Sequence, residues 1–251
     1  MSYIIYQQMP LKYLLIPATF ALFTHCAEKS TSDYTIEASF ASTAPEIDGK
    51  ANDPIWQQAK PIRLKNNRTG KEVQESALQT HVKASYDDKN LYFLFECKDP
   101  DIWAEFTQRD EYLWKEEVVE VFIDVDDEPE TYVEIEVSPA NILFDSYIVD
   151  PENIDVPATA KFNLPGIRTG VTVQGTLNKR EDKDDGWTVE MAIPFEDLAN
   201  ATTERVGPET EIRLNFFRLD KNQGKEFASY AWSPTGKSFH KPSVFGKLVF
   251  K

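Results

Sequence analysis

The stretch "VVEVFIDVDDEPETYVEIEVS", residues 118–138, decides the fold class of this 251-residue chain. Apolar and acidic side chains alternate on both sides of the acidic, proline-containing turn at residues 126–130. Successive side chains of a strand point to opposite faces of a sheet, so this alternation is typical of strands that bury one face. The stretch therefore predicts two antiparallel strands joined by a turn.

Shorter versions of this pattern follow one another along the chain, separated by turns that contain Gly, Pro, Asn and Asp. They lie at residues 78–88, 91–99, 142–149, 171–177, 186–195, 211–220 and 246–251. Helical signals are sparse, with one turn predicted within residues 52–60 and another within residues 195–200. Many short strands with few helices predict an all-β fold, an antiparallel β-sandwich that forms a single domain with minor helical turns.

The alternation also sorts side chains between the core and the opposite face of the sheet. The predicted core holds Val119, Val121, Ile123, Val133, Ile135, Val137, Ile212, Leu214 and Phe216, together with Trp56, Trp187 and Trp232. The opposite face carries Glu120, Phe122, Asp124, Tyr132, Glu134, Glu136, Ser138, Arg213, Asn215 and Phe217. Such a surface suits a sugar, because hydroxyls need polar partners and the C–H face of the ring packs on an aromatic plane.

The charge balance narrows the classes of partner. The chain has 27 basic and 42 acidic residues, which gives a formal net charge of -15. Nucleic-acid affinity comes largely from Lys and Arg that neutralise phosphates, and anionic lipid also attracts basic segments. The composition therefore argues against nucleic acid and against docking on an anionic membrane surface, and neutral ligands such as sugars remain compatible with it.

The N-terminus predicts export. The apolar run at residues 13–23 has the length of a signal-peptide core and is too short to span a bilayer. Residues 1–26 are therefore predicted to be a signal peptide, and the polar residues 27–42 a linker before a domain over residues 43–251. A cysteine directly after the apolar run makes Cys26 a candidate lipidation residue, which would anchor the protein in the outer membrane. An ordinary cleaved signal, leading to the periplasm or the exterior with Cys26 incidental, is the alternative.

The second cysteine, Cys97, shares the phase of Phe93 and Phe95 within its predicted strand. We interpret it as a small buried hydrophobic residue. The sequence has no CxxC pair and no HExxH motif, so it gives no support for a zinc site.

Seven motifs in a fixed order resemble the family 9 carbohydrate-binding modules, within the wider DOMON-like group of immunoglobulin-like or jelly-roll-like sandwiches. The resemblance covers roughly residues 43–250. Its motifs are "APEIDGKANDPIWQQAKPI" (44–62), "VKASYDDKNLYFLFECKDPDI" (82–102), "LWKEEVVEVFIDVD" (113–126), "YVEIEVSPANILFD" (132–145), "GWTVEMAIPFEDL" (186–198), "LNFFRLD" (214–220) and "YAWSPTGKSFHKPSVFGKLVF" (230–250).

The resemblance implies a binding mode. Two aromatic side chains of the sugar-binding members sandwich the sugar at the reducing end of a glycan, and the matching positions here are Trp114 and Phe239. It also implies that Glu120 binds hydroxyls. The strand that supplies basic and amide contacts in those members carries Glu134 and Glu136 here, and a carboxylate cannot replace a donor.

The extra acids need compensation, because two neighbouring carboxylates repel each other. Arg213, Arg218, a cation or the ligand could balance them. The interpretation as a whole is non-catalytic binding of a glycan end or small saccharide at the cell envelope, linked to polysaccharide breakdown, by a monomer. Glu120, Glu134, Glu136, Arg213 and Asn215 are the expected polar contacts.

Three alternatives remain open. The domain could be a structural or accessory envelope protein that has lost the sugar site, or a b-type haem protein with Met191 and His240 as axial ligands. Paired carboxylates also serve glycosidases, but residues on one face of adjacent strands always lie close together, so no catalytic residue is assigned. No cofactor is expected, except that the acidic turn at 124–130 leaves structural calcium open.

Overall fold

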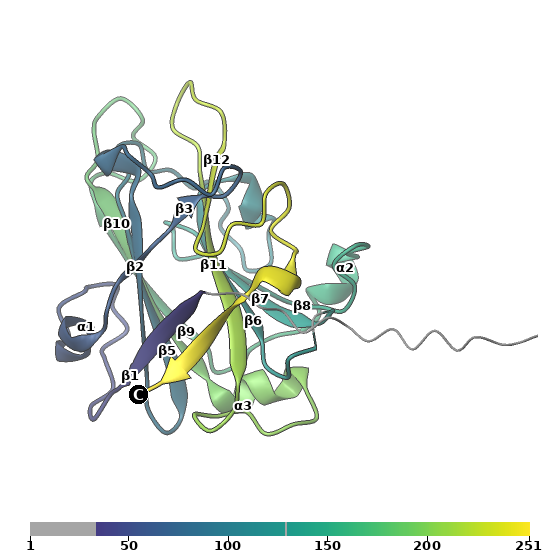
Figure 1. Cartoon of the computed structure of the whole chain (residues 1–251). Coiled ribbons are helices and arrows are strands. Elements are labelled where there is room, and N and C mark those ends of the chain that lie inside the picture. The colour runs from purple at the N-terminus through teal and green to yellow at the C-terminus, as the bar shows by residue number, and fades with distance from the viewer. Residues whose placement is uncertain (1–33, 129) are drawn as a thin grey trace, which may run out of the picture.

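The computed structural model describes residues 34–128 and 130–251, and its strands join into one curled sheet that nearly closes on itself (Figure 1). The predicted signal peptide, Cys26 and the first part of the predicted linker lie outside the described residues. No helix within the described ranges is long and apolar enough to cross a membrane.

The elements are mostly short strands, which confirms the all-β prediction. The strands are β1 (Thr35–Phe40), β2 (Ile62–Arg63), β3 (Lys65–Asn66), β4 (Thr80–Tyr86), β5 (Asn90–Cys97), β6 (Val118–Asp124), β7 (Tyr132–Val137), β8 (Leu143–Ile148), β9 (Arg168–Gln174), β10 (Gly186–Pro194), β11 (Ile212–Asp220), β12 (Ala228–Ala231) and β13 (Gly246–Phe250). The helical turns are α1 (Pro54–Gln58), η1 (Ser76–Leu78), η2 (Leu113–Lys115), α2 (Val156–Thr159), α3 (Phe195–Leu198), η3 (Ala199–Ala201) and η4 (Pro242–Val244).

Two groups of strands form the two layers of the sandwich. One has the order β8-β7-β6-β11-β13, and the other has the order β1-β4-β5-β10-β9. Both predicted hairpins are present, since β4 pairs with β5 and β6 pairs with β7 in antiparallel register.

Strand β1 departs from two expectations. It pairs in parallel with both β13 and β4, so the sheet is not purely antiparallel. It also begins at Thr35, inside the segment 27–42 that was predicted to be a linker. The physical reason is that Ile36 and Ala38 alternate with polar residues and are almost completely buried, so this segment has an apolar face that the domain core covers.

The main core lies between the two layers. The ring of Phe216 in β11 meets the rings of Phe93 and Phe95 in β5 edge-on, with centroid distances of 5.0 and 5.7 Å. The predicted core residues are all buried, and Cys97 is a buried free thiol whose pKa burial raises to about 12. Trp56 is also buried, but it belongs to a separate cluster under α1, where its Nε1 donates to Glu190 Oε1 at 2.6 Å.

The outer face of β6, β7 and β11 is covered along part of its length. Phe122, Tyr132 and Phe217 pack there against Phe245 and Ile148 in a second aromatic cluster. The expectation of an open polar surface is therefore wrong at this end, because the segments before β13 and after β8 fold over it.

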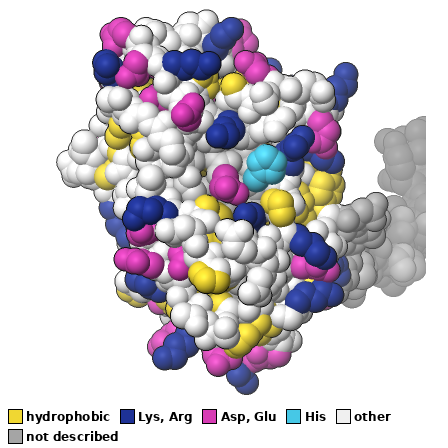
Figure 2. Space-filling view, turned by 90° about the vertical axis from the view of Figure 1, so that its left-hand side faces the viewer, with side chains coloured by type: hydrophobic (Ala, Val, Ile, Leu, Met, Phe, Trp, Pro, Cys, Tyr) yellow, Lys and Arg dark blue, Asp and Glu magenta, His cyan; other side chains and the backbone are white. Residues whose placement is uncertain are grey.

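The face that lies on the left-hand side of Figure 1 carries acidic and basic side chains interspersed, with only scattered hydrophobic groups (Figure 2). Mixed charges without a broad apolar patch are typical of a solvated surface. The candidate site lies on the other layer.

Candidate functional site

A cavity of about 480 Å³ opens on the outer face of β6 and β7, beyond the second aromatic cluster. Its volume is in the range of pockets that hold small molecules. It is lined by Arg68, Trp114, Glu120, Glu134, Glu136, Phe144, Ile154, Val156, Thr159, Leu219, Phe227, Ser229, Lys237, Phe239 and His240. Five of the seven residues that the sequence predicts for the site are among them.

Trp114 borders the cavity from η2, the short helical turn that precedes β6. Its ring meets the buried ring of Phe144 edge-on at 5.3 Å and stacks on exposed Tyr112 at 4.8 Å. These contacts hold the indole in place while part of it remains accessible. Trp114, which the sequence places just ahead of a strand and beside the charged residues 115–117, is thus a wall of the cavity.

Phe239 borders the same cavity from the long segment between β12 and β13. Its ring lies parallel to that of Phe217, with a centroid distance of 4.2 Å and an interplanar angle of 15°. Within the described residues, no ring contact joins Phe239 to Trp114. Two aromatic walls from separate segments thus border one cavity without touching each other, as a site for a sugar ring requires.

Three glutamates converge on the cavity from adjacent strands. Glu120 of β6 is in register with Glu136 of β7, and Glu134 lies two residues earlier on the same face. One carboxylate oxygen from each lies within 4.8 Å of the other two, and the three side chains are buried. Ser146 Oγ donates to Glu134 Oε2 at 2.9 Å, whereas Glu120 Oε1 and Glu136 Oε2 have no hydrogen-bond partner. We call these three residues the glutamate triad.

Burial sets the charge state of the glutamate triad. Removal from water raises the pKa of Glu134 to about 7 and the pKa values of Glu120 and Glu136 well above their usual range. Repulsion between the carboxylates adds to this effect for Glu120 and Glu136. Near neutral pH the triad therefore retains protons and can donate as well as accept hydrogen bonds.

Arg213 and Asn215 are absent from the residues that line the cavity. Arg213 Nη2 donates to the Phe245 carbonyl at 2.6 Å, and Nη1 lies 3.4 Å from Asp127 Oδ1. Asn215 donates to the Ser233 carbonyl and accepts from the Ser233 amide. The face of the sheet on which both residues lie was predicted correctly. Their side chains, however, bond to the segment between β12 and β13 and do not line the cavity.

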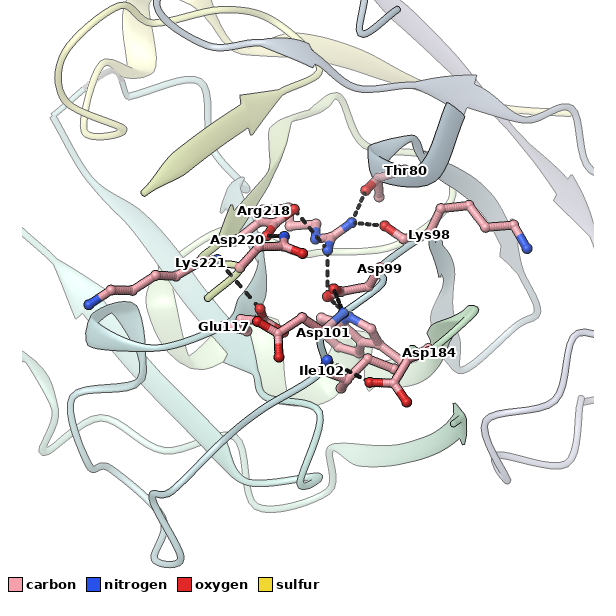
Figure 3. Close-up of polar contacts among 12 residues, drawn as sticks. Thr80, Lys98, Asp99, Asp101, Ile102, Glu117, Asp184, Arg218, Asp220 and Lys221 are labelled. Atoms are coloured by element: carbon pink, nitrogen blue, oxygen red, sulfur yellow. Dashed lines mark hydrogen bonds and ion pairs between the residues drawn. The ribbon is translucent and has the colours of Figure 1, made fainter. Parts of the chain in front are cut away.

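Arg218 is also unavailable to the glutamate triad. It points into the end of the core, where Nη2 lies 2.7 Å from Asp99 Oδ2 and 3.2 Å from Asp220 Oδ2 (Figure 3). Nη1 donates to Thr80 Oγ1 and to the Lys98 carbonyl. Neither arginine that the sequence offered as compensation therefore reaches the triad.

The positions of the acidic residues, of Met191 and of His240 bear on the metal and haem alternatives. Among the described residues, three acids gather at the glutamate triad and at Asp99, Glu117 and Asp220, and the second group already holds the Arg218 guanidinium. The acidic turn at 124–130 forms no such group in the described part of the chain. Met191 is buried in the main core, whereas His240 stacks on Phe122 on the opposite face, so these two residues are not brought together.

Five further polar side chains on the cavity were not predicted from the sequence, and three of them, His240, Lys237 and Arg68, carry a ring nitrogen or a charge. His240 Nδ1 lies 2.7 Å from the Tyr132 hydroxyl, and burial lowers the pKa of His240 to about 4, which keeps the ring neutral. Lys237 and Arg68 are exposed at the cavity. Lys237 and His240 could have been found from their positions beside Phe239, whereas nothing in the sequence points to Arg68, which lies far away along the chain.

Comparisons with known proteins agree with this geometry. Residues 47–251 match the family described as "Carbohydrate family 9 binding domain-like". A protein of the fungus Arthroderma benhamiae described as an extracellular protein is 33% identical over 181 residues, which are 68% of this chain and 78% of that protein. Endo-1,4-beta-xylanase C of Paenibacillus barcinonensis is 24% identical over 82% of this chain, which corresponds to only 16% of the xylanase.

Solved structures share the fold. A family 9 carbohydrate-binding module from Caldicellulosiruptor kristjanssonii, in complex with cellotriose, superposes with a TM-score of 0.60 at 19% identity, covering 87% of this chain and 94% of the module. A complex with glucose matches with the same TM-score at 18% identity. The match of residues 47–251 covers most of the chain and confirms the resemblance: the protein belongs to the carbohydrate family 9 binding domain-like family, a family of non-catalytic binding domains.

Proposed function

We propose that this domain binds the end of a glycan chain or a small saccharide in the cavity between Trp114 and Phe239, without cleaving it. The observation that carries the proposal is the pair of aromatic walls on one cavity, with the glutamate triad on the same cavity. Aromatic planes suit the C–H faces of a sugar ring, and convergent polar groups fix its hydroxyls.

The polar groups provide both kinds of hydrogen bond. Lys237 and Arg68 supply donors at the exposed part of the cavity. When the Tyr132 hydroxyl donates to His240 Nδ1, the proton on Nε2 becomes a further donor. The triad accepts hydrogen bonds and, through its retained protons, also donates them. These groups replace the arginine and asparagine that do not line the cavity.

The wider setting follows from the relatives. The xylanases from Paenibacillus barcinonensis and Thermoanaerobacterium saccharolyticum contain regions similar to this chain, which spans 16% and 13% of their lengths. We propose that the protein is exported and takes part in polysaccharide breakdown, with Cys26 as a lipid anchor. Labelling with a radioactive or clickable fatty acid, compared between wild type and Cys26→Ser, tests the anchor.

The first test is isothermal titration with cello- and xylo-oligosaccharides and with the same sugars reduced to alditols. We expect saturable binding of the oligosaccharides and none of the alditols, because a reduced end no longer forms a ring to fit between two walls. In Trp114→Ala we expect affinity to fall about tenfold or more, which corresponds to about 1.4 kcal/mol.

A matched control is Phe40→Ala, which removes another exposed aromatic ring that is not part of the cavity. It should bind like wild type. Equal binding of alditols would overturn recognition of the reducing end. No binding of any glycan by a folded protein would instead favour the accessory domain that has lost its sugar site.

A further inference from the structure

The glutamate triad is a concentration of buried acid without a buried base. Glu120 is 2% exposed, Glu134 is 6% exposed and Glu136 is 1% exposed, and none of them has an ion-pair partner within 4 Å among the described residues. Arg213 and Arg218 are engaged elsewhere. Retained protons therefore neutralise the triad in the free protein, and a cation that enters the cavity could take the place of those protons.

The unsatisfied atoms point to the same conclusion independently. Glu120 Oε1 and Glu136 Oε2 are buried and lack a hydrogen-bond partner, and both residues line the cavity. Buried polar atoms are normally satisfied, so such atoms at a cavity mark places that a ligand group fills.

We infer that the triad is a subsite for a protonated primary amine, so that the preferred ligand is a saccharide that carries an amino group. This inference rests on the proposed function of the cavity. A primary ammonium has three N–H donors, and the triad offers one carboxylate oxygen from each of three residues within 4.8 Å of one another. One donor can thus reach each carboxylate.

A divalent metal ion fits the triad less well. Calcium takes six to eight oxygen ligands and magnesium requires near-octahedral coordination. Ser146 is the one described side chain outside the triad with a hydrogen bond to it, and its hydroxyl donates to Glu134. Three monodentate oxygens match the donor count of an ammonium group, whereas a metal ion would need several further ligands.

The exposed edge of the cavity, which we call the rim, is compatible with an ammonium ligand. Lys237 and Arg68, the two basic side chains on the cavity, are exposed, whereas the triad is buried. Water screens exposed charges far more than buried ones, so repulsion from the rim is weak beside the attraction of the triad. The C–H faces of the sugar ring would pack against Trp114 and Phe239.

The test compares three β-1,4-linked trimers that differ only at carbon 2: cellotriose with a hydroxyl, the glucosamine trimer with an ammonium, and the N-acetylglucosamine trimer with a neutral amide. Isothermal titration is performed at mildly acidic pH in two buffers of different ionisation enthalpy. We expect the glucosamine trimer to bind about tenfold or more tightly than cellotriose. We also expect it alone to release protons, because the ammonium displaces those held by the triad.

The variant Glu134→Gln keeps the shape of the side chain and removes one acid. It should lose the preference for the amine, so that the ratio of the two affinities, glucosamine trimer over cellotriose, falls toward one whatever happens to the affinity for cellotriose. The matched control is Glu105→Gln, which changes an exposed acid that does not line the cavity. It should keep the preference.

Other outcomes overturn the inference in distinguishable ways. Equal binding of cellotriose and the glucosamine trimer removes the amine subsite and leaves the proposed saccharide binding intact. Equal binding of the glucosamine and acetylated trimers shows that charge is not recognised. Binding of cellotriose that requires added calcium and is lost in Glu134→Gln assigns the triad to a metal ion. If no trimer binds, the proposed function fails together with the inference.

Discussion

Arg218 shows how a charge is held inside the core. Its side chain is completely buried, and acids from both layers surround it: Asp99 follows β5, while Asp220 ends β11. Glu117, whose pKa burial raises to about 10, completes this group near the same end of the sandwich. The guanidinium thus joins the two layers where apolar packing ends.

Replacing Arg218 should therefore be costly. Arg218→Met leaves Asp99 and Asp220 without their cation, and we expect the free energy of unfolding to fall by about 3–5 kcal/mol. The control is Arg205→Met, which removes an arginine that is 85% exposed in its side chain, and its effect should stay within about 0.5 kcal/mol. Urea unfolding of both variants measures the difference, and similar losses would show that the buried network is not important for stability.

Single residues also show how far sequence reasoning reaches. The alternation of apolar and polar residues predicted that Glu120, Glu134 and Glu136 lie together on one face. The reason is that the side-chain alternation of each strand and the hairpin pairing of β6 with β7 determine which residues are neighbours. The same rule placed Arg213 and Asn215 on that face, but it could not tell which part of the face the segment before β13 covers. His240 and Arg68 reach the cavity through loops, whose paths carry no periodicity.

At the scale of elements, β1 was assigned to a linker although its Ile36 and Ala38 alternate like those of any half-buried strand. Six residues between polar neighbours give a weak signal, and the parallel partners of β1 lie far away along the chain. The hairpins β4–β5 and β6–β7 were predicted because their partners are adjacent in sequence. Local pairings could thus be predicted from the sequence, whereas distant ones could not.

Strand β13 provides a test at this scale. A Cβ atom added to Gly246 would lie 2.4 Å from the ring of Trp232 and 2.8 Å from the Tyr34 carbonyl oxygen. We expect Gly246→Ala to lower the free energy of unfolding by about 1–3 kcal/mol, because neither a core indole nor the backbone can move aside cheaply. Lys247→Ala, at the half-buried neighbouring position, removes a surface ion pair with Glu211 and should cost less than about 1 kcal/mol. Thermal unfolding compares the two, and an unchanged midpoint in Gly246→Ala would contradict this packing.

At the scale of the whole molecule, buried acids should determine how stability depends on pH. Removal from water raises the pKa values of Glu134 and Asp124 to about 7 and that of Glu117 to about 10. A group whose pKa is higher in the folded state stabilises the fold below its ordinary pKa, and this contribution is lost as the pH rises through the folded value. His240, with its pKa lowered to about 4, opposes this trend only below its ordinary value of 6.5.

We therefore expect the thermal unfolding midpoint to fall as the pH rises from about 5 to about 10, since Glu134 and Asp124 contribute to the fall up to about pH 7 and Glu117 up to about pH 10. The double variant Glu120→Gln and Glu136→Gln should show a flatter profile, because two of the titrating groups are gone. Glu37→Gln, which removes an exposed acid whose pKa Lys60 lowers, should leave the slope above neutral pH unchanged. A rising midpoint in wild type over this range would contradict the buried, protonated state of the triad.

The pairing of β1 with β13 also has a consequence for how the chain acquires its structure. Residues 35–38 lie beside residues 247–250, so the first described strand finds one of its neighbours only when the last one exists. During synthesis, residues 246–250 must therefore leave the ribosome before the sheet can join at β1. Partners so distant in sequence also slow the search for the native topology, into the range of milliseconds to seconds typical of β-sandwiches. Chains that end before residue 246 should remain substrates for chaperones and proteases.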